Sequence, residues 1–115
     1  MRTWGFLTNH AHVLIQIARD PRSTVREIAV STGITERATH AILSDLRDSN
    51  IVDVTREGRR NAYRVDVQAL ANYPRWAASE MNIPRPLIDA TIKGLAEVAI
   101  NRPAPVHQLP RARSD

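Results

Sequence analysis

Gly33 stands between two stretches of sequence that both have the apolar spacing of an amphipathic helix. The first stretch opens at Thr24, with Glu27 three residues later, which is the pattern of a capping box. The second opens at Thr35, a favourable N-cap residue, and extends over roughly residues 36–49. Because glycine adopts the left-handed backbone conformation at a helix exit without steric cost, we expect two helices joined by a tight turn at this point.

A further helical pattern precedes these two and contributes to the same apolar core. It runs over residues 9–19, where Thr8 can cap its start and Asp20-Pro21 ends it, because proline disfavours helical conformation in the residue before it. Asn50 suits the left-handed conformation that terminates the helix over residues 36–49. The residues expected to face the core from the three helices are Val13, Leu14, Ile17, Ala18, Val25, Ile28, Ala29, Ala38, Ile42, Leu43 and Leu46.

The apolar period changes to two after residue 51, where Ile51 is expected to pack back on the helices. Val52 and Val54 alternate with polar residues, and Tyr63 and Val65 do the same. Alternation on both sides of a glycine-containing turn predicts a β-hairpin over residues 52–66. Its expected tip is the basic sequence Arg56-Glu57-Gly58-Arg59-Arg60-Asn61.

The C-terminal part contains a short helical pattern at 67–73, then prolines, then an amphipathic pattern that predicts a helix over about 86–101. The last residues, 102–115, include three prolines and few large apolar groups, and we expect them to be disordered. The resulting division is a folded domain over residues 6–67, a helical extension over 68–101 and a tail.

Composition excludes several classes of protein. The 115 residues include no cysteine, so disulfides, thiolate catalysis and Cys-ligated zinc are absent. No apolar run approaches the roughly 20 residues of a membrane helix, and the N-terminus lacks the apolar stretch of a signal peptide, so we expect a cytoplasmic protein without a membrane partner. The net charge is +4, and of the 16 basic residues only Lys93 is lysine. Arginine binds phosphates and guanine edges in a bidentate way that lysine cannot. The alternative explanation of the arginine excess is a genomic base composition that favours arginine codons.

The order helix, helix, tight turn, helix, hairpin is that of a winged helix-turn-helix, a mainly helical fold with a small β-hairpin. In this arrangement the helix after the tight turn, here residues 36–49, enters the DNA major groove, and its N-terminal residues contact base edges. Arg37 can pair with guanine and Glu36 can accept from cytosine, while a basic hairpin tip can reach phosphates or a minor groove. The predicted DNA-binding residues are Thr35, Glu36, Arg37, Thr39, His40, Ser44, Arg56, Arg59, Arg60 and Asn61. Of these, Thr39 lies near the core in helical phase and can pack instead of reading bases.

The sequence TVREIAVSTGITERATHAILSDLRDSNIVDVTREGRRNAYRV resembles the winged helix-turn-helix of MarR/ArsR-like bacterial transcription regulators, over about residues 6–67. The resemblance implies that Thr35, Glu36, Arg37, His40 and Ser44 face the major groove and that Arg59, Arg60 and Asn61 lie on the wing. Two positions depart from the family pattern. Ala41 replaces a residue that is often basic, and Asn50 replaces a glycine.

Members of this family usually act as homodimers, which would match a palindromic site on double-stranded DNA. The residues expected at a dimer interface form the apolar stripe of the predicted C-terminal helix, about residues 86–101: Leu87, Ile88, Thr91, Ile92, Leu95 and Val98. The alternative is that this helix packs on its own domain. We favour the dimer because three helices and a wing can close a core without it.

Other functions have less support in the sequence. His10 and His12 point about 200° apart on a helix and cannot share one metal ion, so we expect no metal site and no cofactor. No catalytic triad or phosphate-binding glycine loop is recognisable, and we expect no enzymatic activity.

The leading hypothesis is a dimeric repressor. Whether it also binds a small-molecule effector stays open, because no residue indicates a specific ligand. The alternative is a winged-helix protein-interaction module without specific DNA binding.

Overall fold

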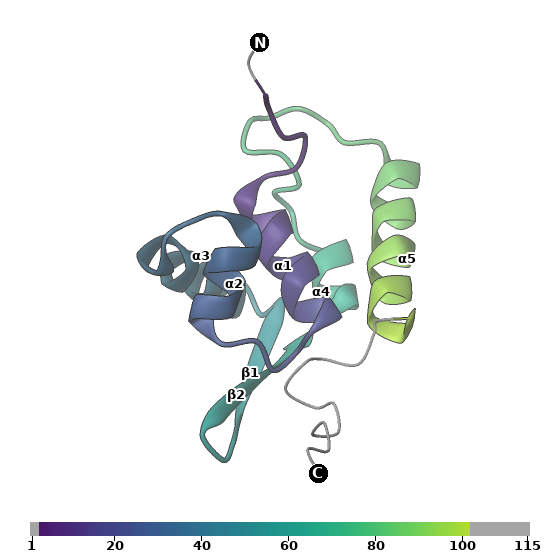
Figure 1. The fold of residues 1–115 in the computed structure, drawn as a ribbon. Helices are drawn as coiled ribbons and strands as arrows, with labels where there is room; N and C mark the ends of the chain where they lie inside the picture. The colour runs from purple at the N-terminus through teal and green to yellow at the C-terminus, as the bar shows by residue number, and fades with distance from the viewer. Residues whose placement is uncertain (1–2, 102–115) are drawn as a thin grey trace.

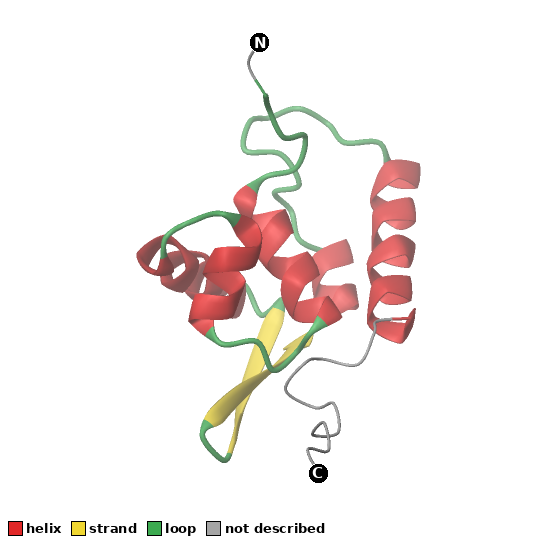
Figure 2. Cartoon of the chain, in the orientation of Figure 1, coloured by secondary structure: helices red, strands yellow, loops and turns green. Residues whose placement is uncertain are grey.

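The computed structural model describes residues 3–101, which form helices and one two-stranded antiparallel sheet (Figures 1 and 2). In chain order the elements are α1 (Asn9–Arg19), α2 (Val25–Thr32), α3 (Glu36–Asp48), β1 (Val52–Glu57), β2 (Arg60–Val65), α4 (Val67–Ala71) and α5 (Arg85–Asn101). This order confirms the predicted mainly helical fold with a hairpin and a C-terminal helix. The predicted disordered tail, residues 102–115, lies outside the described part of the chain.

The three N-terminal helices begin and end as their sequence predicts. The side chains of Thr8, Thr24 and Thr35 accept hydrogen bonds from backbone N–H groups in the first turns of α1, α2 and α3, respectively. Both halves of the capping box of Thr24 and Glu27 are present. Gly33 and Asn50 have φ of 75° and 62°, so both adopt the left-handed conformation that ends a helix without a long connection.

The core lies between α1, α2 and α3 and is closed by the base of the hairpin. Nine of the eleven predicted core residues are buried, and the other two, Val25 and Ala38, are half-buried. Ile51 and Val52, at 2% exposure each, extend this core toward the sheet, and the Tyr63 ring packs against it. Aliphatic side chains thus supply most of the buried surface, as the low aromatic content requires.

The hairpin projects from the helical body, away from the end where the described N-terminal residues lie (Figure 1). Its strands pair in register from Val52 opposite Val65 to Glu57 opposite Arg60. The turn is therefore shorter than the predicted six-residue tip and consists of Gly58 and Arg59 alone. Gly58 has φ of 62°, which suits the first central position of a tight hairpin turn.

Helix α5 packs along α1 and α4 on one side of the molecule (Figure 1). Leu95 is 8% exposed and belongs to the same apolar cluster as the buried residues of α1, and Val98 packs against that cluster. Ile88 is also buried, at 9% exposure. The dimer role predicted for Ile88 and Leu95 is therefore wrong, because these side chains are buried within their own chain. Ile92 and Val98 are half-buried, whereas Leu87 and Thr91 are exposed.

Residues 3–101 include no helix with the length and apolar character needed to cross a membrane.

Candidate nucleic-acid interface

One face of α3 carries polar side chains toward solvent from its first turn onward. Glu36, Arg37, His40 and Ser44 are all exposed, and their side chains form no hydrogen bond or ion pair with the described residues 3–101. Thr35 is exposed too, but its hydroxyl oxygen accepts the N–H of Ala38 at 3.0 Å. The α3 face thus presents donors and acceptors that are not used within the fold.

Thr39 lies on the opposite side of α3 and has no exposed surface. Its hydroxyl donates a hydrogen bond of 2.9 Å to the carbonyl oxygen of Thr35. The predicted DNA contact by Thr39 is wrong, because a fully buried side chain on the core face of the helix cannot reach a base edge. Its alternative role, packing in the core, is the one that the structure adopts.

Two arginines of the hairpin are exposed near its tip. Arg59 lies in the turn and forms no hydrogen bond or ion pair with any of the residues from 3 to 101. The Nε of Arg56 donates to the carbonyl oxygen of Gly58 at 3.0 Å, which braces the turn and leaves the remaining guanidinium N–H groups available. Asn61, on β2, is half-buried.

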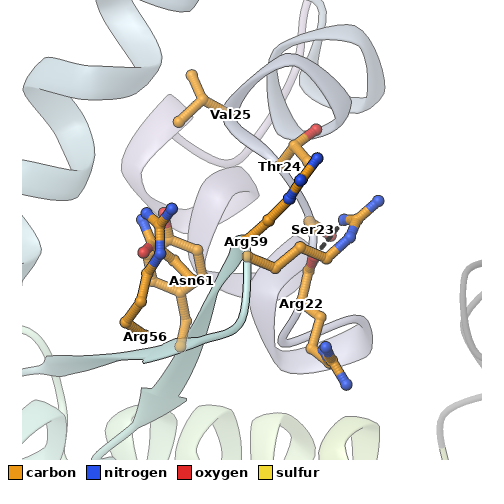
Figure 3. A pocket seen from close by; sticks show the side chains of 9 residues that line it. Arg22, Ser23, Thr24, Val25, Arg56, Arg59 and Asn61 are labelled. Carbon is orange, nitrogen blue, oxygen red and sulfur yellow. Dashed lines mark hydrogen bonds between the residues drawn. The ribbon is translucent and has the colours of Figure 1, made fainter.

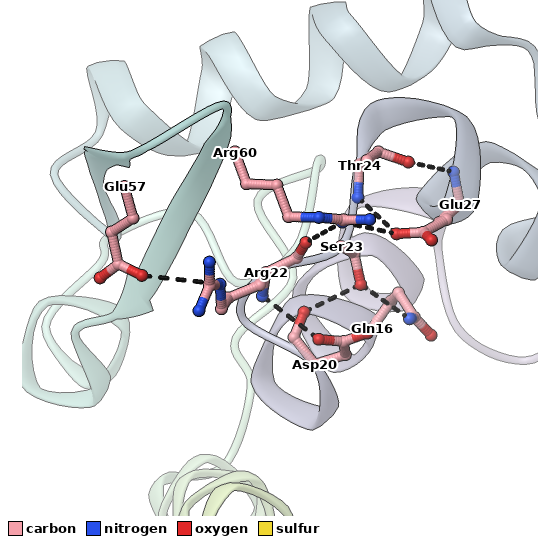
Figure 4. A network of polar contacts seen from close by, with 8 residues as sticks. All are labelled: Gln16, Asp20, Arg22, Ser23, Thr24, Glu27, Glu57 and Arg60. Carbon is pink, nitrogen blue, oxygen red and sulfur yellow. Dashed lines mark hydrogen bonds and ion pairs between the residues drawn. The ribbon is translucent and has the colours of Figure 1, made fainter. Parts of the chain in front are cut away.

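Arg60 differs from its neighbour Arg59, because its guanidinium is held within the fold (Figure 4). Its Nη1 donates to the carbonyl oxygen of Arg22 at 2.7 Å and lies 3.3 Å from Oε1 of Glu27. The prediction that grouped Arg60 with the free basic residues of the wing therefore needs correction. Its Nη1 is directed at the turn between α1 and α2 and at the first turn of α2.

A pocket of about 150 Å³ opens between the hairpin and that turn (Figure 3). Four arginines line it, and two of them are paired with carboxylates, Arg60 with Glu27 and Arg22 with Glu57. The residues that line it are Arg22, Ser23, Thr24, Val25, Arg56, Arg59, Arg60, Asn61 and Tyr63. Positive charge therefore gathers where the wing meets the start of α2, a favourable place for an anion.

Glu27 is the acidic group that organises this region. Hydrogen bonding from the backbone N–H of Thr24, at 2.8 Å, lowers the pKa of its carboxyl group, and the guanidinium of Arg60 lowers it further, while partial burial acts in the opposite direction. Glu27 is therefore ionised at neutral pH and keeps both the cap of α2 and the ion pair with Arg60.

The histidines and carboxylates of the described residues do not cluster in the way that metal binding requires. Within the described residues 3–101, no three His, Asp or Glu side chains lie close enough to hold a metal ion. Nε2 of His10 instead lies 2.8 Å from Oδ2 of Asp45, which links α1 to α3.

Residues 8–53 match a protein-family model whose description is winged helix-turn-helix DNA-binding. The fold is a winged helix-turn-helix. The matched segment contains α1, α2, α3 and the first residues of β1, and it covers less than half of the chain. The rest of the wing comes from the hairpin seen in the structure. The match supports a DNA-binding regulator with DNA as its partner, without indicating a particular branch of such regulators. Neither the curated proteins nor the solved structures contain a match to this chain.

Sequence reasoning missed the part that Arg22 and Glu27 play in the winged helix-turn-helix. The sequence around Glu27 indicates only half of a capping box, although a second partner, Arg60, lies 33 residues further along the chain. No local signal in the sequence indicates this second role, because the contact joins distant parts of the chain.

Proposed function

We propose that this chain is a sequence-specific DNA-binding transcription regulator that acts as a repressor, of the MarR/ArsR-like kind that its sequence resembles. Helix α3 would read the major groove, and the wing would contact the phosphate backbone or an adjacent minor groove. Such a regulator would work in the bacterial cytoplasm, where its operator lies.

One observation carries this proposal, namely the row of unused polar side chains along the exposed face of α3. Arg37 can donate in a bidentate way to guanine, Glu36 can accept from cytosine, and His40 and Ser44 continue the same face one and two turns later. Buried or paired side chains could not make such contacts. The free cation of Arg59 on the wing supplies an attraction to phosphates that does not depend on sequence.

We propose further that the regulator is a homodimer, so that two copies of α3 meet successive major grooves of a palindromic site. The support is exposed apolar surface away from the wing. Trp4 is 76% exposed, Phe6 88%, Met81 68% and Leu87 55%. In Figure 1 the described N-terminal residues and the loop that leads to α5 lie at the same end of the molecule. Side chains of this size are seldom so exposed together unless a partner covers them.

The experiment that tests DNA recognition is fluorescence anisotropy with purified protein. One labelled duplex has the sequence just upstream of the protein's own gene and the other has the same bases scrambled, each at two salt concentrations. We expect binding to the upstream duplex to be tighter by at least about a hundredfold, a threshold just below the range of specificity ratios of DNA-binding regulators. Equal and salt-sensitive binding to both duplexes would contradict sequence specificity for that site, and no binding to either would favour a protein-interaction module.

A further inference from the structure

The two adjacent arginines of the wing have different surroundings. Arg59 is exposed and has no hydrogen-bond or ion-pair partner within residues 3–101, whereas Arg60 donates to the Arg22 carbonyl oxygen at 2.7 Å. The Arg60 side chain is 30% exposed, and its Nη1 also lies 3.3 Å from the carboxylate of Glu27. One cation is thus free at the surface, and the other bridges the wing to the helices.

The Glu27 carboxylate joins this bridge to helix α2. Its Oε1 accepts the backbone N–H of Thr24 at 2.8 Å and also faces Arg60. The same oxygen therefore belongs both to the capping box of α2 and to the contact with the wing. Because α2 and α3 are separated only by a tight turn at Gly33, a wing held against the start of α2 has a fixed position relative to α3.

Two more contacts join the hairpin to the same turn between α1 and α2, and Figure 4 draws the one between Arg22 and Glu57. The backbone N–H of Tyr63 donates to the carbonyl oxygen of Pro21 at 2.8 Å, and Nε of Arg22 lies 3.6 Å from Oε1 of Glu57. Tyr63 lies closer to the base of the hairpin than Arg60 does. The distance between Arg22 and Glu57 is long for a hydrogen bond. Arg60 therefore makes the closest side-chain contact between the helices and the outer half of the hairpin.

A two-stranded hairpin has little stability of its own and needs to pack against something to keep one orientation. The outer residues of this hairpin are exposed and contribute little to the core: Thr55, Arg56, Glu57, Gly58 and Arg59. Without the Arg60 bridge, the turn and its free arginine would be connected to the helices mainly through the base of the sheet.

We propose that Arg60 is a positioning residue: together with Glu27 it sets the orientation of the wing relative to α2 and α3, and it does not itself contact DNA. This inference rests on the proposed function, since orientation matters for binding only if the wing meets DNA. Arg59 would then attract the phosphates by its charge, and Arg60 would keep the wing ordered before DNA binds. A segment ordered in advance loses less conformational entropy on binding.

The first test needs no DNA and measures the order of the wing. Backbone ¹⁵N relaxation gives order parameters for the amides of residues 56–61 in the wild type and in four variants. Arg60→Gln and Glu27→Ala each remove one end of the bridge, and we expect order parameters below about 0.6 in both, against about 0.85 for a rigid backbone. Arg59→Gln is the matched control, because it removes the same charge from the neighbouring residue. Thr24→Ala controls for the cap of α2, because it breaks the other half of the capping box and leaves Glu27 facing Arg60.

The second test uses DNA affinity, where the two roles of Arg60 predict opposite signs. If Arg60 is a positioning residue, Glu27→Ala weakens binding by about threefold to tenfold, the cost of ordering a loosened segment, although the protein becomes more positive. If Arg60 contacts a phosphate instead, removal of Glu27 frees it and binding becomes tighter. Tighter binding by Glu27→Ala, or unchanged wing order in Arg60→Gln, would overturn the proposal. Failure of the wild type to bind DNA would count against the proposed function alone, because the order parameters would still decide whether Arg60 orders the wing.

Discussion

The hydroxyl of Thr39 donates to the carbonyl oxygen of Thr35, one turn earlier in α3, so this side chain satisfies its hydrogen bond within the helix while it packs in the core. With Thr39 fully buried, the residues before and after it, Arg37 and His40 among them, turn toward solvent. The surface that we assign to DNA is therefore defined by the core on the opposite side of the same helix.

Thr39→Val tests the assignment of this residue to the core. Valine keeps the shape of threonine and removes the hydroxyl, while the Thr35 carbonyl oxygen still accepts the backbone N–H of residue 39 at 3.0 Å. We expect a loss of at most about 1.5 kcal/mol in the free energy of unfolding, measured by urea denaturation, because no acceptor is left unpaired. DNA affinity should stay at the wild-type value, and a specific loss of affinity would show that Thr39 does reach the DNA.

Arg37→Ala should relax base preference at one position of the operator. The side chain is exposed and has no partner within residues 3–101, so its removal should leave the free energy of unfolding within about 0.5 kcal/mol of wild type. The loss of binding free energy to the preferred operator should be about 1–3 kcal/mol. The measurement is anisotropy against a set of duplexes that each change one base pair. If the ranking of these duplexes is the same for the variant and the wild type, Arg37 does not read a base.

Arg59→Ala should weaken binding to all sequences about equally, since the wing cation is expected to meet phosphate. The slope of log affinity against log salt concentration should become shallower by about one, which corresponds to one contact with phosphate. Lys93→Ala, on α5, is a control that also removes one exposed positive charge. An unchanged salt slope for Arg59→Ala would place this arginine away from the DNA.

Acidification should remove the contribution of the Glu27 charge to stability. Since the pKa of Glu27 is lowered in the folded protein, its contribution is present above the ordinary value of 4.5 and disappears as pH falls through the lower, folded value. The Glu27 side chain is 48% exposed, so we expect Glu27→Gln to cost less than about 1 kcal/mol at pH 7. Thermal unfolding of both proteins between pH 7 and pH 2 should show their difference shrinking on acidification. A difference that is constant over this range would mean that the charge of Glu27 does not stabilise the fold.

Helix α5 offers a matched pair of leucines for separating folding from dimerisation. Leu95 is 8% exposed and Leu87 55% exposed on the same helix. Leu95→Ala should therefore destabilise the chain by about 2–5 kcal/mol, as for other buried leucines. Leu87→Glu should leave the fold intact and shift the sedimentation equilibrium from dimer toward monomer. If Leu87→Glu has the same oligomeric state as the wild type, the outer face of α5 is not part of a dimer interface.

The fold could be predicted well because its determinants are local in the sequence. Each boundary of an element depends on a few neighbouring residues. The helices begin at the caps Thr8, Thr24 and Thr35, and α2 ends at Gly33. The hairpin begins where the apolar period changes, after residue 51. The length of the hairpin turn was less predictable, because the polar residues at its tip fit either a strand or a loop.

The roles of particular side chains depended on contacts between distant parts of the chain. Nothing near position 60 shows that its guanidinium meets a carbonyl oxygen 38 residues earlier. Likewise, the apolar stripe of α5 fits a dimer interface and an internal core equally well. Only the packing of α5 against α1 distinguishes the buried Leu95 from the exposed Leu87.

Whether the exposed face of α3 and the wing meet DNA can be decided by titrating ¹⁵N-labelled protein with a duplex and mapping the shifts of the amide signals. If α3 and the wing contact DNA, the largest changes will occur at residues 35–44 and 56–61, and the amide signals of α5 will shift little. Changes concentrated in α5 and residues 3–8, with α3 unchanged, would contradict this mode of binding.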